Sequence, residues 1–87
     1  MVKPKPIYRA FNELTDQQTE VMKFIIWWVK TENTPVPKKE VVKAMREAKM
    51  KVDVINWSLN VLLAKGYIRR GWTERMNTTV YVQLRNL

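Results

Sequence analysis

The sequence contains no cysteine and no histidine. Without cysteine, disulfide bonds and thiolate metal sites are excluded. Without histidine, the commonest metal ligand and the commonest acid–base catalyst are both missing. The chain has two glycines, Gly66 and Gly71, so it has no glycine-rich phosphate loop. Because its 8 carboxylates also suggest no acid–base pair, we expect a protein that is not an enzyme and that uses no cofactor and no metal ion.

Apolar runs of membrane-spanning length are absent as well. The run from Phe24 to Val29 has six residues, whereas a spanning helix needs about 20. Lys3 and Lys5 stand near the N-terminus, but prolines interrupt this region and no apolar stretch of signal-peptide length follows. We therefore expect a cytoplasmic protein.

The chain has 87 residues, which is enough for one domain, and it is strongly basic. Its 16 lysines and arginines against 8 acids give a net charge of +8. The excess is uneven, with +4 over residues 34–52 and +3 over residues 67–87. Such a distribution favours a polyanionic partner, most often nucleic acid. The alternative is a solvated basic surface that keeps the protein in solution.

Residues 1–13 form a basic, proline-containing segment that we interpret as an N-terminal arm. Lysine and proline alternate over residues 3–6, and proline fixes φ and removes a hydrogen-bond donor, so an extended backbone is expected. Ile7, Tyr8 and Phe11 supply apolar anchors for the domain or for a partner. The remaining residues, 14–87, are predicted to form one domain.

A first helix is predicted from Thr15 to about Asn33. Thr15 and Gln18 fit a capping box, and Pro35 disfavours helix at the residue before it. Apolar residues recur at helical spacing, at Val21, Phe24, Ile25, Trp28 and Val29. Met22, Ile26 and Trp27 widen this face, which predicts a helix that is central in the fold or buried in a dimer.

Two more helices and an extended residue are predicted next. Val36, between two prolines, is expected to pair as a single edge bridge. Pro37 suits the first turn of a helix that runs to about Ala48, with Val41, Ala44 and Met45 inward. A third helix is predicted from Asp53, as its N-cap, to Lys65. Its inward stripe is Ile55, Leu59, Leu62 and Leu63.

The last third of the chain is predicted to form a hairpin. Gly66 is placed as the left-handed terminator of the third helix. Residues 67–72 and 78–84 are rich in types that favour strands, and Val80, Val82 and Leu84 alternate with Tyr81 and Gln83. Residues 73–77 form the loop, with Asn77 shaping the turn. The predicted class is α+β, mostly helical.

This order of elements resembles the winged helix-turn-helix superfamily over residues 14–84. The best local marker is Leu62-Leu63-Ala64-Lys65-Gly66-Tyr67-Ile68, and the basic residues Arg69 and Arg70 extend it. Residues 34–41 are similar to the approach to the second helix in that superfamily. The resemblance implies three helices followed by a two-stranded β-hairpin wing.

The resemblance also implies how the domain would meet DNA. The third helix would enter the major groove, with Asn56 and Asn60 as candidates to bind adenine and Trp57 to contact a thymine methyl or a sugar. The candidates for phosphate contacts are Lys38, Lys39, Lys49 and Lys51 beside this helix, and Arg69, Arg70 and Arg75 on the wing. The alternative for the asparagines and the basic residues is ordinary exposure to solvent, and the alternative for Trp57 is that it buries a rim of the core.

The expected function is therefore binding of double-stranded DNA by a transcriptional regulator or a replication or architectural factor, as a homodimer through the first helix and the arm. One alternative is a protein-interaction module, because Val54, Trp57 and Val61 form a second apolar stripe on the third helix. Another is a single-stranded nucleic-acid binder that stacks bases on Trp57, Trp72 and Tyr81.

Overall fold

The computed structural model describes residues 14–75 and 77–86. Its elements follow in the order α2 (Asp16–Glu32), β1 (Val36–Pro37), α3 (Lys38–Glu47), α4 (Val52–Ala64), β2 (Ile68–Thr73) and β3 (Thr78–Gln83). The predicted class, α+β and mostly helical, is confirmed. The predicted arm, residues 1–13, lies outside the described residues.

The capping signals of α2 act as predicted at both of its ends. The Gln18 amide donates to Thr15 Oγ1 at 3.2 Å, and the Thr15 amide donates to Gln18 Oε1 at 3.0 Å. Asn33 takes the left-handed conformation, with φ of 57°, and its amide donates to the Val29 carbonyl oxygen at 2.8 Å. Both bounds of the helix are therefore set by short-range interactions.

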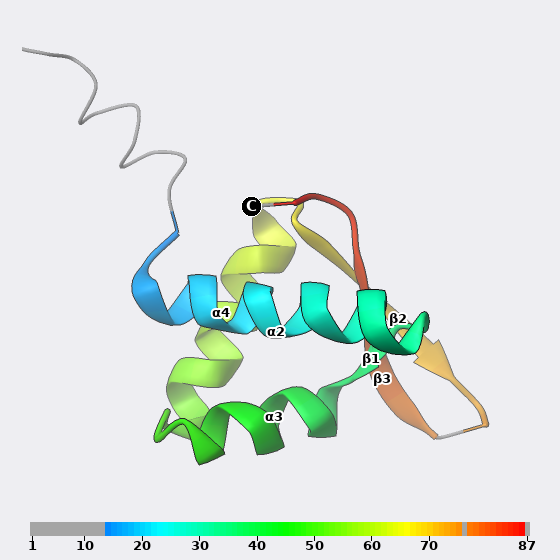
Figure 1. Cartoon of the computed structure of the whole chain (residues 1–87), viewed down its shortest axis with the longest axis horizontal. Coiled ribbons are helices and arrows are strands. Elements are labelled where there is room, and N and C mark those ends of the chain that lie inside the picture. Colours follow the sequence, from blue (N-terminus) through cyan, green and yellow to red (C-terminus); the bar gives the residue numbers. More distant parts are fainter. Residues whose placement is uncertain (1–13, 76, 87) are drawn as a thin grey trace, which may run out of the picture.

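The sheet has three antiparallel strands in the order β1-β3-β2 (Figure 1). The predicted bridge at Val36 is confirmed, because Val36 pairs with Tyr81 and Pro37 pairs with Val80. This short strand includes Pro37 as well as Val36, and it forms the third strand of the sheet. Asn77 has φ of 51° in the loop between β2 and β3, as expected for a residue that shapes the turn.

The start of α4 differs from the prediction. The predicted N-cap, Asp53, lies in the first turn, while Lys51 is the N-cap without a side-chain hydrogen bond. The Ile55 amide already donates to the Lys51 carbonyl oxygen at 3.0 Å, so the helix begins two residues earlier than a side-chain cap would place it. Asp53 still suits the positive end of the helix dipole.

The end of α4 matches the prediction. Gly66 has φ of +79°, a conformation that residues with a Cβ adopt at a cost. Its amide donates to the Leu63 carbonyl oxygen at 3.1 Å, and the Tyr67 amide donates to that of Leu62 at 2.9 Å. These bonds satisfy carbonyl groups of the last turn and direct the chain into β2.

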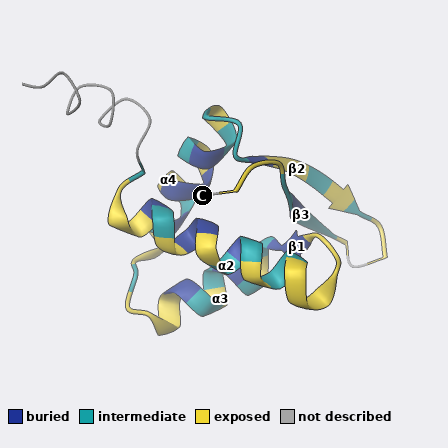
Figure 2. Cartoon of the chain, turned by 45° about the horizontal axis from the view of Figure 1, so that its top comes forward, coloured by how far each residue is buried: buried dark blue, intermediate teal, exposed yellow. Residues whose placement is uncertain are grey.

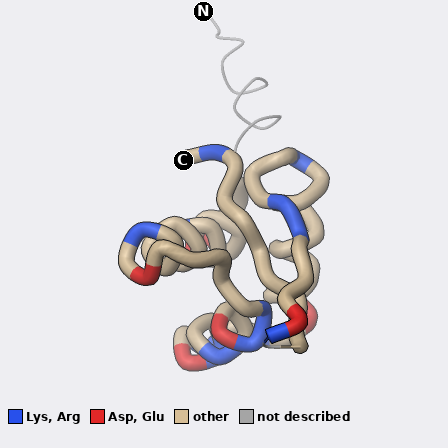
Figure 3. Tube along the Cα trace, turned by 90° about the vertical axis from the view of Figure 1, so that its right-hand side faces the viewer, with Lys and Arg blue, Asp and Glu red and all other residues tan. Residues whose placement is uncertain are grey.

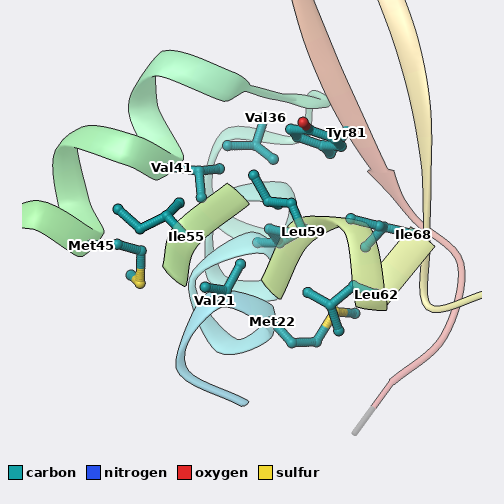
Figure 4. Packing of buried hydrophobic residues seen from close by; sticks show 11 residues of the cluster. Val21, Met22, Val36, Val41, Met45, Ile55, Leu59, Leu62, Ile68 and Tyr81 are labelled. Atoms are coloured by element: carbon teal, nitrogen blue, oxygen red, sulfur yellow. The ribbon is translucent and has the colours of Figure 1, made fainter. Parts of the chain in front are cut away.

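The hydrophobic core lies where α2 crosses α4, with α3 and the sheet closing it (Figures 1 and 4). The helices contribute Val21, Met22, Ile25, Val41, Met45, Ile55, Leu59 and Leu62. The strands contribute Val36, Ile68 and Tyr81. Figure 4 shows these side chains converging between the helices and the sheet. The core thus fixes α3 and the sheet relative to α2 and α4.

The outer faces carry several large apolar residues. Those classed as exposed are Trp27, Val52, Trp57, Trp72 and Leu84, and Figure 2 shows exposed positions along the outward turns of the helices. In the described part of the chain, no helix has both the length and the apolar character needed to cross a membrane. Exposed tryptophans on the surface of a folded domain often mark a site of interaction with another molecule.

Candidate nucleic-acid interface

A shallow basic depression, with a volume of about 800 Å³, lies between α3 and the start of β3. Its lining consists of Lys38, Lys39, Val42, Lys43, Arg46, Glu47 and Thr78. Lys39, Lys43 and Arg46 share one face of α3, because residues three or four positions apart are neighbours on a helix. We call Lys38, Lys39, Lys43 and Arg46 the α3 cations. Two of them, Lys43 and Arg46, were not among the predicted site residues, although their spacing from Lys39 is a usable signal.

The α3 cations have no partner of opposite charge among residues 14–75 and 77–86. The ion pair present in that part of the chain joins Lys23 Nζ to Glu20 Oε2 at 3.7 Å, on the outer face of α2. In Figure 3, α3 lies at the lower edge of the molecule, where basic positions stand beside acidic ones without forming ion pairs. The four side chains are thus available to an external anion such as a phosphate.

Lys49 and Lys51 add two cations just beyond the C-terminal end of α3. Both are exposed in the turn between α3 and α4, where Lys49 has φ of 68°. Because α3 has 10 residues, this turn lies about 15 Å along the helix from Lys38. The structure therefore places four of the predicted phosphate contacts, Lys38, Lys39, Lys49 and Lys51, at the two ends of one helix.

The outer face of α4 is neutral and carries the predicted base-reading residues. Trp57 is 63% exposed, Asn60 is exposed and Asn56 is half-buried. The second apolar stripe has Val54 and Val61 half-buried on either side of Trp57. Since Asp53 is the one charged residue of α4, this face has no cation of its own for phosphates.

The two arginines of β2 do not share a surface. Arg69 pairs with Val82 and Arg70 pairs with Tyr81, and successive residues of a strand point to opposite faces. Both side chains are exposed, and their joint action with Arg75 stays a prediction. Arg75 itself is exposed in the loop that follows β2.

Tyr81 belongs to the core, so the prediction that its ring is a stacking platform is wrong. It is 3% exposed, because its register opposite Val36 turns it toward the helices. Burial raises the pKa of the Tyr81 hydroxyl above its ordinary value of 10.0, and the nearby Arg70 guanidinium lowers it in part. The neutral phenol is thereby favoured in the folded protein.

A second groove, of about 540 Å³, lies between the C-terminal end of α2 and the hairpin. We call it the tryptophan groove. It is lined by Trp28, Thr34, Pro35, Pro37, Trp72, Thr73, Arg75 and Val80. The sequence did not predict this groove. Its walls come from three separate segments, namely α2, the residues just before α3, and the hairpin, and no local sequence pattern shows that these segments lie together.

Among the described residues, no group of three or more His, Cys, Asp or Glu side chains could hold a metal ion. Comparisons of the chain with protein-family models, curated proteins and solved structures gave no match. The functional argument therefore depends on the geometry and charge of the basic depression, the α4 face and the tryptophan groove.

Proposed function

We propose that this chain is a winged-helix protein that binds double-stranded DNA and catalyses no reaction. The order of helices and strands supports the winged-helix interpretation, since a hairpin follows the third helix and a short strand precedes the second. The observation that carries the DNA-binding proposal is the set of α3 cations. They lie together beside the start of β3, and they have no ion-pair partner within the described residues.

In the proposed complex, affinity comes mainly from phosphate contacts. The α3 cations, with Lys49 and Lys51, neutralise phosphates and release counterions. The outer face of α4 lies toward the bases, where Asn56 and Asn60 are the candidates for base contacts. Arg75, with Arg69 or Arg70, contacts the backbone from the hairpin. Because α4 has no cation on its outer face, we expect weak sequence preference, which suits an architectural or replication factor as well as a regulator.

The proposal includes a homodimer formed through α2 and the arm. On α2, Trp27 is 53% exposed and its ring centroid lies 5.8 Å from that of Phe24. A second copy covering these rings would bury apolar surface and present two DNA-binding faces. Light scattering at increasing protein concentration should then show a mass of two chains; a single-chain mass throughout would remove the dimer from the proposal. A cytoplasmic, nucleoid-associated location follows from the same proposal.

Binding to a duplex as a function of salt tests the DNA-binding proposal. For about six phosphate contacts, the association constant should fall roughly 10³-fold between 50 and 200 mM salt. Fluorescence anisotropy with a labelled random-sequence duplex measures this fall. Absence of binding, or affinity that does not change with salt, would overturn the proposal.

A protein-interaction module is the second candidate function, and the 63% exposure of Trp57 favours it. Exposed aromatic side chains flanked by half-buried apolar residues are common at interfaces between proteins. Trp57→Ala separates the two functions. Loss of capture of a protein partner with unchanged duplex affinity would support this candidate, whereas loss of duplex affinity would assign Trp57 to the DNA interface.

A further inference from the structure

We infer that the tryptophan groove holds an unpaired DNA nucleotide next to the bound duplex, so that the protein prefers duplexes with a single-stranded overhang. This inference rests on the proposed DNA-binding function. It follows from three features of the groove: two tryptophan rings, an arginine in a lining that contains no carboxylate, and adjacency to the basic depression.

The two tryptophans of the groove differ in exposure and in the contacts that hold them. Trp28 is half-buried, its Nε1 donates to Thr34 Oγ1 at 3.3 Å, and its ring centroid lies 6.2 Å from that of Phe24. Trp72 is 60% exposed on β2, where it pairs with Thr79. The groove between them has a volume of about 540 Å³, within the range of small-ligand sites. Aromatic side chains bind unpaired bases of any type by stacking.

The charge of the groove selects an anionic ligand. Arg75 is the charged residue in its lining, which contains no carboxylate, and within the described residues Arg75 forms no ion pair. The neighbouring groove between α2 and α3 also has aromatic walls, Phe24, Trp27 and Trp28, but its lining holds two carboxylates, Glu40 and Glu47, against one cation, Lys43. That excess of negative charge makes it less favourable for a phosphate than the groove beside Arg75.

The tryptophan groove continues directly from the basic depression. Pro37 lines the groove and the next residue, Lys38, lines the depression. On the hairpin, Thr73 lines the groove and pairs with Thr78, which lines the depression. A strand whose phosphates bind the α3 cations would therefore reach the groove within a short distance. This continuity is why we assign the groove to DNA and not to a separate ligand.

The test compares a blunt duplex with the same duplex carrying a short single-stranded overhang. Stacking of one base predicts that the overhang raises wild-type affinity by roughly 5- to 100-fold. Trp72→Ala should abolish this preference and leave the affinity for the blunt duplex unchanged. Trp72→Phe, which keeps an aromatic wall, should restore part of the preference.

Trp27→Ala is the matched control, because Trp27 is similarly exposed at 53% but does not line the groove. It should keep the full preference for the overhang. Equal affinity of the wild type for both DNAs would overturn this inference and leave the proposed function standing. Equal loss of both affinities in Trp72→Ala would also overturn it. Absence of binding to any duplex would instead overturn the proposed function and, with it, this inference.

Discussion

The helices α3 and α4 differ in charge and in burial. α3 presents Lys39, Lys43 and Arg46 on one exposed face, has Lys38 half-buried at its start, and buries two core residues, Val41 and Met45. α4 presents a neutral outer face, while its inner face buries Ile55, Leu59 and Leu62 against α2 and the sheet. In the proposed complex, electrostatic affinity therefore comes from α3, and α4 mainly holds the fold and presents a weakly discriminating surface to the bases.

The largest effect should follow from a change on the inner face of α4. Leu59 is 1% exposed, so Leu59→Ala removes buried apolar surface and leaves a cavity. The free energy of unfolding should fall by about 2–5 kcal/mol. Denaturant titration measures the change, and the exposed neighbour Asn60→Ala is the control, expected within about 0.5 kcal/mol of wild type. A loss below about 1 kcal/mol for Leu59→Ala would mean that α4 is not central to stability.

A smaller change of opposite sign is expected one position earlier on α4. Ser58 is 1% exposed, and its Oγ has no hydrogen-bond partner among the described residues. Removing a buried polar group without a partner avoids its desolvation cost, and alanine also favours helix. Ser58→Ala should therefore raise the free energy of unfolding by about 1 kcal/mol. Destabilisation of similar size would show that the hydroxyl is satisfied in solution.

The smallest effect is expected from the outer face of α4. On a random-sequence duplex, the double variant Asn56→Ala and Asn60→Ala should bind within about 3-fold of wild type, because a base contact discriminates between sequences without adding uniform affinity. The same anisotropy titration applies. A large loss of affinity for every duplex would show that α4 contributes to overall affinity, contrary to its assignment to α3. A loss of affinity confined to one sequence would identify α4 as a base-reading helix.

The parts of the fold that sequence reasoning predicted are those set by neighbouring residues. The capping box of Thr15 and Gln18 and the left-handed Gly66 follow from local chemistry, and both are present. That Val36 is extended also follows from its flanking prolines, although its partner strand does not. The start of α4 was missed because the backbone of Lys51 caps the helix without a side-chain signal.

The candidate site was harder to predict, because its surfaces depend on tertiary register. The burial of Tyr81 follows from pairing with Val36, 45 positions away in the sequence, and strand alternation alone does not say which face meets the helices. The tryptophan groove requires Trp28 and Trp72, 44 positions apart in the sequence, to line one groove. By contrast, the spacing of Lys39, Lys43 and Arg46 is a local signal that puts them on one side of a helix, but Lys43 and Arg46 were not among the predicted phosphate contacts.

The salt dependence of duplex affinity, measured for wild type and for a variant with all four α3 cations changed to glutamine, tests the central claim most directly. Lys23→Gln is the control, since Lys23 lies on α2 in an exposed ion pair with Glu20. Each lost phosphate contact lowers the slope of log affinity against log salt by about 0.9, so the α3 variant should lose about 3 to 4 from the slope and the control less than about 1. An α3 variant with the wild-type slope would contradict the assignment of phosphate binding to α3.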